Sequence, residues 1–209
     1  MDHKDSQADP TGAVTRKSIG ARRNPASQEA ILDAAEAVLK EGGVAGFSIE
    51  AVAKKARAGK PTIYRWWPNR TALMLDVYRR FKNERPFPDT GSLRADLVAF
   101  LDNQLLGFWH NSLAATVYRA LIAEAQTDQA AADALYAYQE GRKAVVIEII
   151  EKAKLRGECA PEVNSELIVD LIVSYAWHQL LLGRVEAAMG TIEAVVDSVL
   201  RGALNSTTR

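Results

Sequence analysis

The sequence predicts an all-α protein of about nine helices, arranged as a small N-terminal unit and a larger helical bundle. Apolar residues recur three and four positions apart along most of the 209-residue chain, which is the period of a helix face. Capping residues, glycines and prolines bound the segments that carry this period. No segment shows the alternation of a strand, and 48% of the residues are apolar, which is enough to bury a substantial core.

Four helices are predicted in the N-terminal unit, residues 24–86. The preceding residues, 1–23, lack the helical period and are expected to form a flexible tail with a basic end. Asn24-Pro25 is typical of a helix start, because asparagine caps helices and proline is tolerated in the first turn. Gly42-Gly43 is then expected to end this first helix.

Two short helices and a longer one complete the unit. Ser48 can cap the first short helix, which is expected to stop near Arg57-Ala58-Gly59. The second short helix is predicted over about 60–67, where Pro68 ends it because the residue before a proline avoids the helical region. Asn69 then caps the last helix of the unit.

The larger part, residues 87–209, carries longer apolar stripes. Helices are predicted over about 92–108, 112–126, 128–156, 164–182 and 191–204.

The formal net charge is zero, but the charges are unevenly distributed. Residues 1–85 hold 16 Lys and Arg against 10 Asp and Glu, whereas residues 86–209 hold 10 against 16. A basic first third joined to an acidic remainder indicates that only the first third faces a polyanion.

The two short helices, joined by a turn of about three residues, predict a helix-turn-helix. In this motif the second helix lies in the major groove of DNA, with its N-terminal residues near the base edges. Ile63 and Trp67 are four apart and are expected to point into the core, so a basic helix lying on the surface with buried tryptophans is the plainer alternative. The outward side chains of this helix are Lys60, Thr62, Arg65 and Trp66.

The segments SIEAVA (48–53) and KPTIYRWWPNRTAL (60–73) resemble the DNA-binding domain of the TetR family of transcriptional repressors. The resemblance covers about residues 26–85, while the rest of the chain is similar to the family in helix number and length. It implies that Thr62 and Tyr64 contact phosphates and that Arg70 clamps the DNA backbone. The full set of expected DNA contacts is Ser48, Lys60, Pro61, Thr62, Tyr64, Arg65, Trp66 and Arg70.

Two positions depart from the family pattern. Arg57 stands where the turn usually has glycine, and Gly59 stands where the next helix usually has a serine or threonine cap. A non-glycine residue in the left-handed conformation costs about 1 kcal/mol, so the turn is expected to be shifted.

Dimerisation and ligand binding are expected in the acidic part. The helix over 164–182 is apolar on two faces. This indicates that one face packs against the core of its own chain and the other against a second copy of the chain. The expected dimer contacts are Val173, Trp177, Leu181, Val195 and Val199. Aromatic and polar residues on neighbouring helices also suggest a small-molecule cavity, with ordinary core packing as the alternative. Its expected lining is Phe100, Gln104, Phe108, Tyr118, Tyr138, Arg142, Tyr175 and His178.

The resemblance implies a cytoplasmic repressor that binds a palindromic operator as a homodimer and is released by a small-molecule ligand. A helical adaptor or ligand-binding protein without sequence-specific DNA binding is the alternative. An enzyme is not expected, because the sequence lacks a glycine-rich phosphate loop, metal-ligand spacing and a nucleophile with its base. No cofactor, metal or membrane partner is expected, and the single Cys159 allows no internal disulfide.

Overall fold

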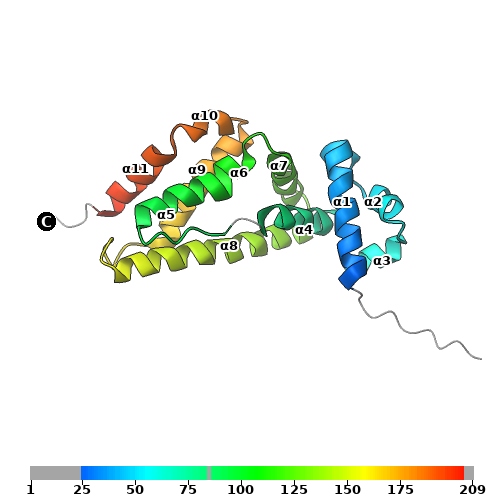
Figure 1. Ribbon diagram of the computed structural model, residues 1–209, viewed down its shortest axis with the longest axis horizontal. Helices are drawn as coiled ribbons and strands as arrows, with labels where there is room; N and C mark the ends of the chain where they lie inside the picture. Colours follow the sequence, from blue (N-terminus) through cyan, green and yellow to red (C-terminus); the bar gives the residue numbers. More distant parts are fainter. Residues whose placement is uncertain (1–24, 84–85, 205–209) are drawn as a thin grey trace, which may run out of the picture.

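A computed structural model describes residues 25–83 and 86–204, and within these ranges it contains helices and no strand (Figure 1). The all-α prediction is confirmed. The expected tail over 1–23 and the expected cap Asn24 lie outside the described residues.

Among the described residues, four helices lie in the N-terminal part, and seven α-helical segments and one π-helix lie in the remainder. The first four are α1 (Pro25–Gly46), α2 (Ile49–Ala56), α3 (Lys60–Tyr64) and α4 (Arg70–Asn83). The others are α5 (Leu93–Ala99), η1 (Phe100–Leu106), α6 (Gly107–Trp109), α7 (Leu113–Ala125), α8 (Gln129–Leu155), α9 (Ser165–Leu181), α10 (Val185–Met189) and α11 (Ile192–Leu204).

Side-chain caps begin the helices where the sequence predicts them. The Ser48 hydroxyl accepts a hydrogen bond from the Ala51 N–H at 3.1 Å, and the Asn69 amide oxygen accepts one from the Ala72 N–H at 2.8 Å. These caps satisfy backbone donors that a helix start leaves without partners. The same arrangement starts three helices of the larger part, with caps at Ser92, Asp128 and Asn164.

Several helix boundaries differ from the prediction. Regular α3 ends at Tyr64, although the backbone turns once more to Trp67 through hydrogen bonds to the Ile63 carbonyl. The expected break after the first helix is a kink at Gly43, which has a φ of 60°, and a further turn follows it. Helix α10 was not predicted, because five residues are too few to show a helical period.

The expected helix over 92–108 contains a π-helix. Segments α5, η1 and α6 follow one another without a gap, and the Gly107 N–H donates to the Asp102 carbonyl, five residues back. A Cβ at Gly107 would lie 2.9 Å from that carbonyl oxygen, so only glycine fits this close turn. Such wide turns often occur at functional sites.

Helix α4 connects the two parts of the molecule. Helices α1, α2 and α3 form one end, and the larger bundle extends from the opposite side of α4 and α7 (Figure 1). Helix α4 packs against α1 on one side and against α7 and α8 on the other. The buried apolar side chains of both parts therefore form one continuous core, from Ile31, Val52 and Ile63 through Met74 to Leu101, Val117, Ile172 and Val196.

Candidate nucleic-acid interface and ligand cavity

Helix α3 is anchored by two buried side chains, as the sequence predicts. Ile63 is 0% exposed and Trp67 is 2% exposed. The Trp67 indole N–H also donates to the Asp76 carboxylate at 2.8 Å, which ties the end of the α3 turn to α4. With only five residues, α3 depends on this packing for its position, because isolated short helices are unstable in water.

The opposite side of α3 faces solvent. Lys60, Pro61, Tyr64 and Arg65 are exposed, and Thr62 is half-buried. Trp66 departs from the expectation that it points outward. Its ring is half-buried, packs against the core and lies 6.3 Å from the Trp67 ring.

Two exposed ion pairs lie on this basic surface. The Lys60 ammonium pairs with Glu50, and the Lys55 ammonium pairs with Glu41. The Lys60 pair lowers the pKa of Glu50 and raises the pKa of Lys60 through the hydrogen bond and the opposite charge. Exposed pairs contribute little to stability, so these lysines could exchange a carboxylate for a phosphate or a base edge at low cost.

Arg57 does take the left-handed conformation, with φ 50° and ψ 38°. Its N–H donates to the Lys54 carbonyl, and the Ala58 N–H donates to the Ala53 carbonyl, which together form a Schellman motif. The turn is therefore not shifted, which corrects the expectation from the sequence. Gly157 and Gly183 take the same position, with positive φ and the same pair of hydrogen bonds, at the ends of α8 and α9.

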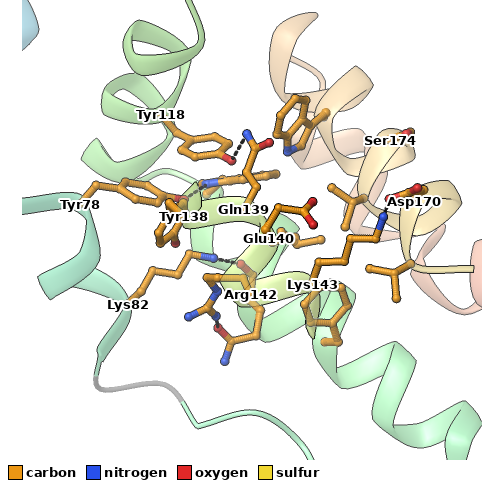
Figure 2. Close-up of a pocket in the computed structure, with 17 residues that line it drawn as sticks. Tyr78, Lys82, Tyr118, Tyr138, Gln139, Glu140, Arg142, Lys143, Asp170 and Ser174 are labelled. Carbon is orange, nitrogen blue, oxygen red and sulfur yellow. Dashed lines mark hydrogen bonds and ion pairs between the residues drawn. The ribbon is translucent and has the colours of Figure 1, made fainter. Parts of the chain in front are cut away.

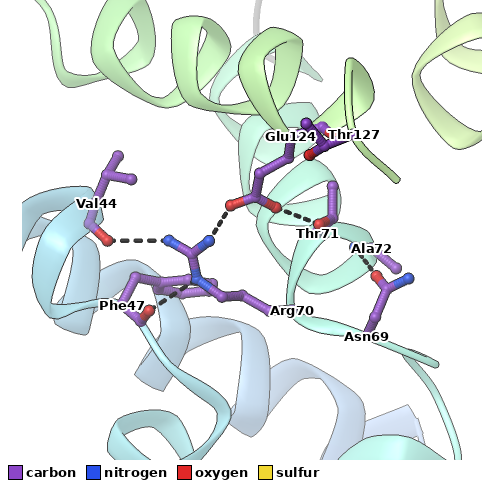
Figure 3. A network of polar contacts seen from close by, with 8 residues as sticks. All are labelled: Val44, Phe47, Asn69, Arg70, Thr71, Ala72, Glu124 and Thr127. Carbon is purple, nitrogen blue, oxygen red and sulfur yellow. Dashed lines mark hydrogen bonds and ion pairs between the residues drawn. The ribbon is translucent and has the colours of Figure 1, made fainter. Parts of the chain in front are cut away.

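Arg70, which is expected at the DNA backbone, is half-buried and contacts the protein itself. Its guanidinium donates to the Phe47 carbonyl at 2.9 Å and to the Val44 carbonyl at 3.1 Å, and it forms an ion pair with Glu124 at the end of α7 (Figure 3). The Thr71 hydroxyl donates to the other oxygen of the same carboxylate. Glu124 therefore joins the start of α4 to the larger bundle.

A cavity of about 240 Å³ lies in the larger part, between α4, η1, α7, α8 and α9 (Figure 2). Five expected residues line it, namely Phe100, Gln104, Tyr118, Tyr138 and Arg142. The buried Gln104 side chain accepts from Arg142 at 2.6 Å, and its backbone carbonyl accepts from the buried Lys82 ammonium. The π-helix thus contains Gln104, whose side chain and backbone carbonyl bind the Arg142 and Lys82 side chains at the cavity.

Three expected lining residues lie elsewhere. Phe108 is buried in the core, with its ring edge-on to Tyr78. The Tyr175 hydroxyl bonds to Thr191 beside α11, and His178 lies on the exposed face of α9. Helix α9 is apolar nearly all round, so the sequence alone does not indicate which residues face the cavity.

Several lining residues were not predicted. Tyr78 and Lys82 come from α4, and Gln139 comes from α8. Tyr78 and Lys82 are four apart and therefore share a helix face, but this spacing by itself does not distinguish a cavity wall from a helix surface.

Two expected dimer contacts also prove to be cavity residues. Val173 and Trp177 are half-buried and line the cavity, so they are not on the outer face of α9. The outer face instead carries exposed leucines, at Leu167, Leu171, Leu181 and Leu182. The half-buried Val199 of α11 lies in a shallow groove with Leu167 and Leu171, and Val195 is half-buried on the same helix. Of the expected dimer contacts on α9, only Leu181 is exposed.

Comparisons with known proteins match both parts of the chain. Residues 87–199 match the family model described as "Tetracyclin repressor-like, C-terminal domain", and residues 31–77 match "Bacterial regulatory proteins, tetR family". The chain belongs to the TetR family. It is therefore a DNA-binding transcriptional regulator, and its relatives are regulators rather than enzymes.

Individual relatives of this TetR family member match over most of their length. The HTH-type transcriptional regulator YdeS of Bacillus subtilis is 29% identical, over 88% of this chain and 92% of the relative. The DNA-binding transcriptional repressor TetR of Mycobacteroides abscessus is 33% identical, over 77% of this chain and 85% of the relative. The crystal structure of the TetR family transcription regulator SCO0332 superposes with a TM-score of 0.73 and 28% identity, over 84% of this chain and 97% of that one.

Within residues 25–83 and 86–204, no three His, Cys, Asp or Glu side chains gather in a way that could hold a metal ion. In the same ranges, no helix combines the length and apolar content needed to cross a membrane. Cys159 is a buried free thiol, and burial raises its pKa.

The left-handed Arg57 leads to a stability prediction. Arg57→Gly should have a free energy of unfolding about 1 kcal/mol higher than Arg57→Ala, because only glycine adopts this conformation without a Cβ clash. Denaturant unfolding measures the difference. Gly157→Ala is the matched control. It replaces the glycine of the same motif at the end of α8, so it should lower the free energy of unfolding by a similar amount. Equal stability of the two Arg57 variants would contradict a strained turn.

The Arg70 network leads to a second prediction. Arg70→Ala should lower the free energy of unfolding by about 1–3 kcal/mol, because it leaves the Val44 and Phe47 carbonyls and Glu124 without this partner. Arg79→Ala, which removes an exposed pair to Asp76 within one helix, should change it by less than about 0.5 kcal/mol. Denaturant unfolding separates the two. If Arg70→Ala leaves stability unchanged but weakens DNA binding, Arg70 contacts the DNA backbone instead.

Proposed function

We propose that the protein is a repressor that binds a palindromic operator as a homodimer and is released from it by a small molecule. Residues 24–86 form the DNA-binding domain in this proposal, and residues 87–209 form the ligand-binding and dimerisation domain. The observation that carries it is the basic outer side of α3, held in place by the buried Ile63 and Trp67. A relative named as a repressor supports the sign of regulation.

The N-terminal end of α3 is the part that would enter the major groove. Lys60 is exposed there and could donate to guanine O6 or N7 once it leaves Glu50. Pro61 is exposed beside it and could contact a thymine methyl group. Thr62, Tyr64 and Arg65 would contact phosphates, which fix position rather than sequence. The half-buried Trp66 would lie at the edge of this interface, and Ser48 would add a hydroxyl at the start of α2.

The outer face of α9 would form the dimer. Three exposed leucines on α9, followed directly by the exposed Leu182, are unusual for a surface that stays in water, and the groove shared with α11 extends the apolar area. A two-fold axis at this face would pair α9 and α11 of one protomer with those of its partner. The two recognition helices could then meet half-sites about 34–36 Å apart.

The ligand signal would travel through α4 and α7. Tyr78 and Lys82 of α4 line the cavity, and the first turn of α4 carries Arg70 beside the helix-turn-helix. Helix α7 similarly runs from Tyr118 at the cavity to Glu124 at the Arg70 ion pair. A ligand that binds better when these helices are displaced would shift the α3 helices out of register with the operator.

Lys60 tests the DNA interface. Lys60→Ala should reduce the preference for a selected operator over a scrambled duplex by about tenfold or more, since a base contact is worth roughly 1–3 kcal/mol. Fluorescence anisotropy titrations on both duplexes at several salt concentrations measure this preference. Lys152→Ala, which also removes an exposed and paired lysine, is the control and should leave it unchanged. If Lys60→Ala binds both duplexes with unchanged affinity, Lys60 does not contact the DNA.

Leu171 tests the dimer. Leu171→Glu should convert a dimer into a monomer at micromolar concentration, because it places a charge in the middle of the apolar face. Sedimentation velocity distinguishes the two masses. Leu155→Glu is the matched control, since Leu155 is 90% exposed at the end of α8 and does not line the groove between α9 and α11. A wild-type protein that sediments as a monomer would contradict the proposed dimer.

A further inference from the structure

Aromatic rings form the inner wall of the cavity. The Tyr118 ring stacks on Tyr78 with ring centres 4.8 Å apart and on Trp109 with ring centres 5.4 Å apart. Trp177 and Tyr138 meet this stack edge-on. Rings held in fixed planes favour a flat ligand, because a second ring gains stacking or edge-on contacts that a saturated chain does not.

A guanidinium lies at this wall with most of its donors uncommitted. Arg142 donates to the Gln104 side chain at 2.6 Å and lies 4.4 Å from the Phe87 ring centre. Among the described residues it forms no ion pair with a carboxylate. A guanidinium has five N–H donors, so Arg142 can still bind the two oxygens of a carboxylate side by side.

The tyrosine hydroxyls around Arg142 are further donors. The Tyr138 hydroxyl is buried and makes no hydrogen bond with any described residue. The Tyr78 oxygen accepts from the Trp109 indole at 3.0 Å and the Tyr118 oxygen accepts from Gln139 at 3.4 Å, so both keep an O–H to donate. Burial raises the pKa of Tyr138 to about 12, and it raises the pKa of the other two as well. All three hydroxyls therefore remain protonated near neutral pH.

The acidic side chains of the cavity lie towards its solvent side. Asp170 is exposed and pairs with Lys143 at 2.8 Å, and Glu140 is also exposed (Figure 2). At the same cavity, Lys82 is buried and Arg142 is half-buried. A cationic ligand would meet like charge beside these two residues, whereas an anionic ligand would meet cations and hydroxyl donors.

We propose that the effector is a planar aromatic carboxylate of one or two rings. Its ring would lie against the tyrosine and tryptophan wall, and its carboxylate would bind Arg142 and accept a hydrogen bond from the Tyr138 hydroxyl. The cavity of about 240 Å³ is smaller than the ~300–1,000 Å³ of sites for drug-sized molecules, which limits the ligand to a small ring system. This inference rests on the proposed function, because it names the ligand class of the same cavity.

Calorimetry with matched probes tests the ligand class. The purified full-length protein is titrated with benzoate and benzamide, with 2-naphthoate and 2-naphthamide, and with cyclohexanecarboxylate. At least one aromatic carboxylate should bind about tenfold or more tightly than its amide, because charge-assisted hydrogen bonds are worth roughly 1.5–3 kcal/mol. Benzoate should also bind more tightly than cyclohexanecarboxylate if the aromatic wall selects a flat ring.

Variants assign the contacts. Arg142→Met should abolish the preference for carboxylate over amide, and Tyr138→Phe should weaken carboxylate binding several-fold while leaving the Arg142 contact in place. Arg184→Met removes an exposed arginine outside the cavity and should leave binding unchanged. Thermal unfolding without ligand checks that each variant is folded. If Arg142→Met does not fold, the Tyr138→Phe titration decides.

Three results would overturn the inference: no binding of either aromatic carboxylate, amides that bind as tightly as the acids, or equal binding of benzoate and cyclohexanecarboxylate. DNA binding by the same ligand-free preparation is measured in parallel. A protein that binds its operator but none of the carboxylates refutes the ligand class and leaves the proposed function intact. A protein that binds no DNA refutes the proposed function, whatever the calorimetry gives.

Discussion

The Arg70–Glu124 ion pair fixes how the two parts of the molecule meet. Arg70 holds the carbonyls of Val44 and Phe47 in the DNA-binding part, while Glu124 belongs to α7 of the larger bundle (Figure 3). From Arg70, α4 continues for about 18 Å to Lys82 at the cavity, at 1.5 Å per residue. A helix of this length moves as one body, so a displacement at its cavity end also reaches the turn that supports α3.

The helix-turn-helix has a tightly packed inner side, whereas the charged groups on its outer side can exchange their partners. Ile63 and Trp67 fix α3 from below, so its position does not depend on the charged groups above it. Those groups pair with neighbouring carboxylates in water, where such pairs are weak. The strained Arg57 fits the same pattern, since backbone strain persists where packing on both sides over-determines it.

The cavity owes its polarity to an irregular helix. In a regular α-helix the apolar stripe of residues 97–108 would continue through position 104, but the π-helix turns Gln104 towards Lys82 and Arg142. The buried amide is tolerated because its oxygen accepts from Arg142 and its N–H donates to the Pro86 carbonyl, while Lys82 donates to the backbone carbonyl of the same residue. The cations in turn are held at an aromatic wall, where a regular core would have only apolar side chains.

The sequence by itself determined the features that depend on neighbours in the chain. These are the all-helical class, the caps at Ser48 and Asn69 and the helix-turn-helix within residues 48–73, because each involves residues a few positions apart. Only the tertiary structure decided the role of Arg70, whose partner Glu124 is 54 residues away, and the faces of α9, which is apolar nearly all round. The π-helix and the buried Lys82 belong to the same group. Their positions follow from packing between distant helices, and such packing leaves no periodic signal in the chain.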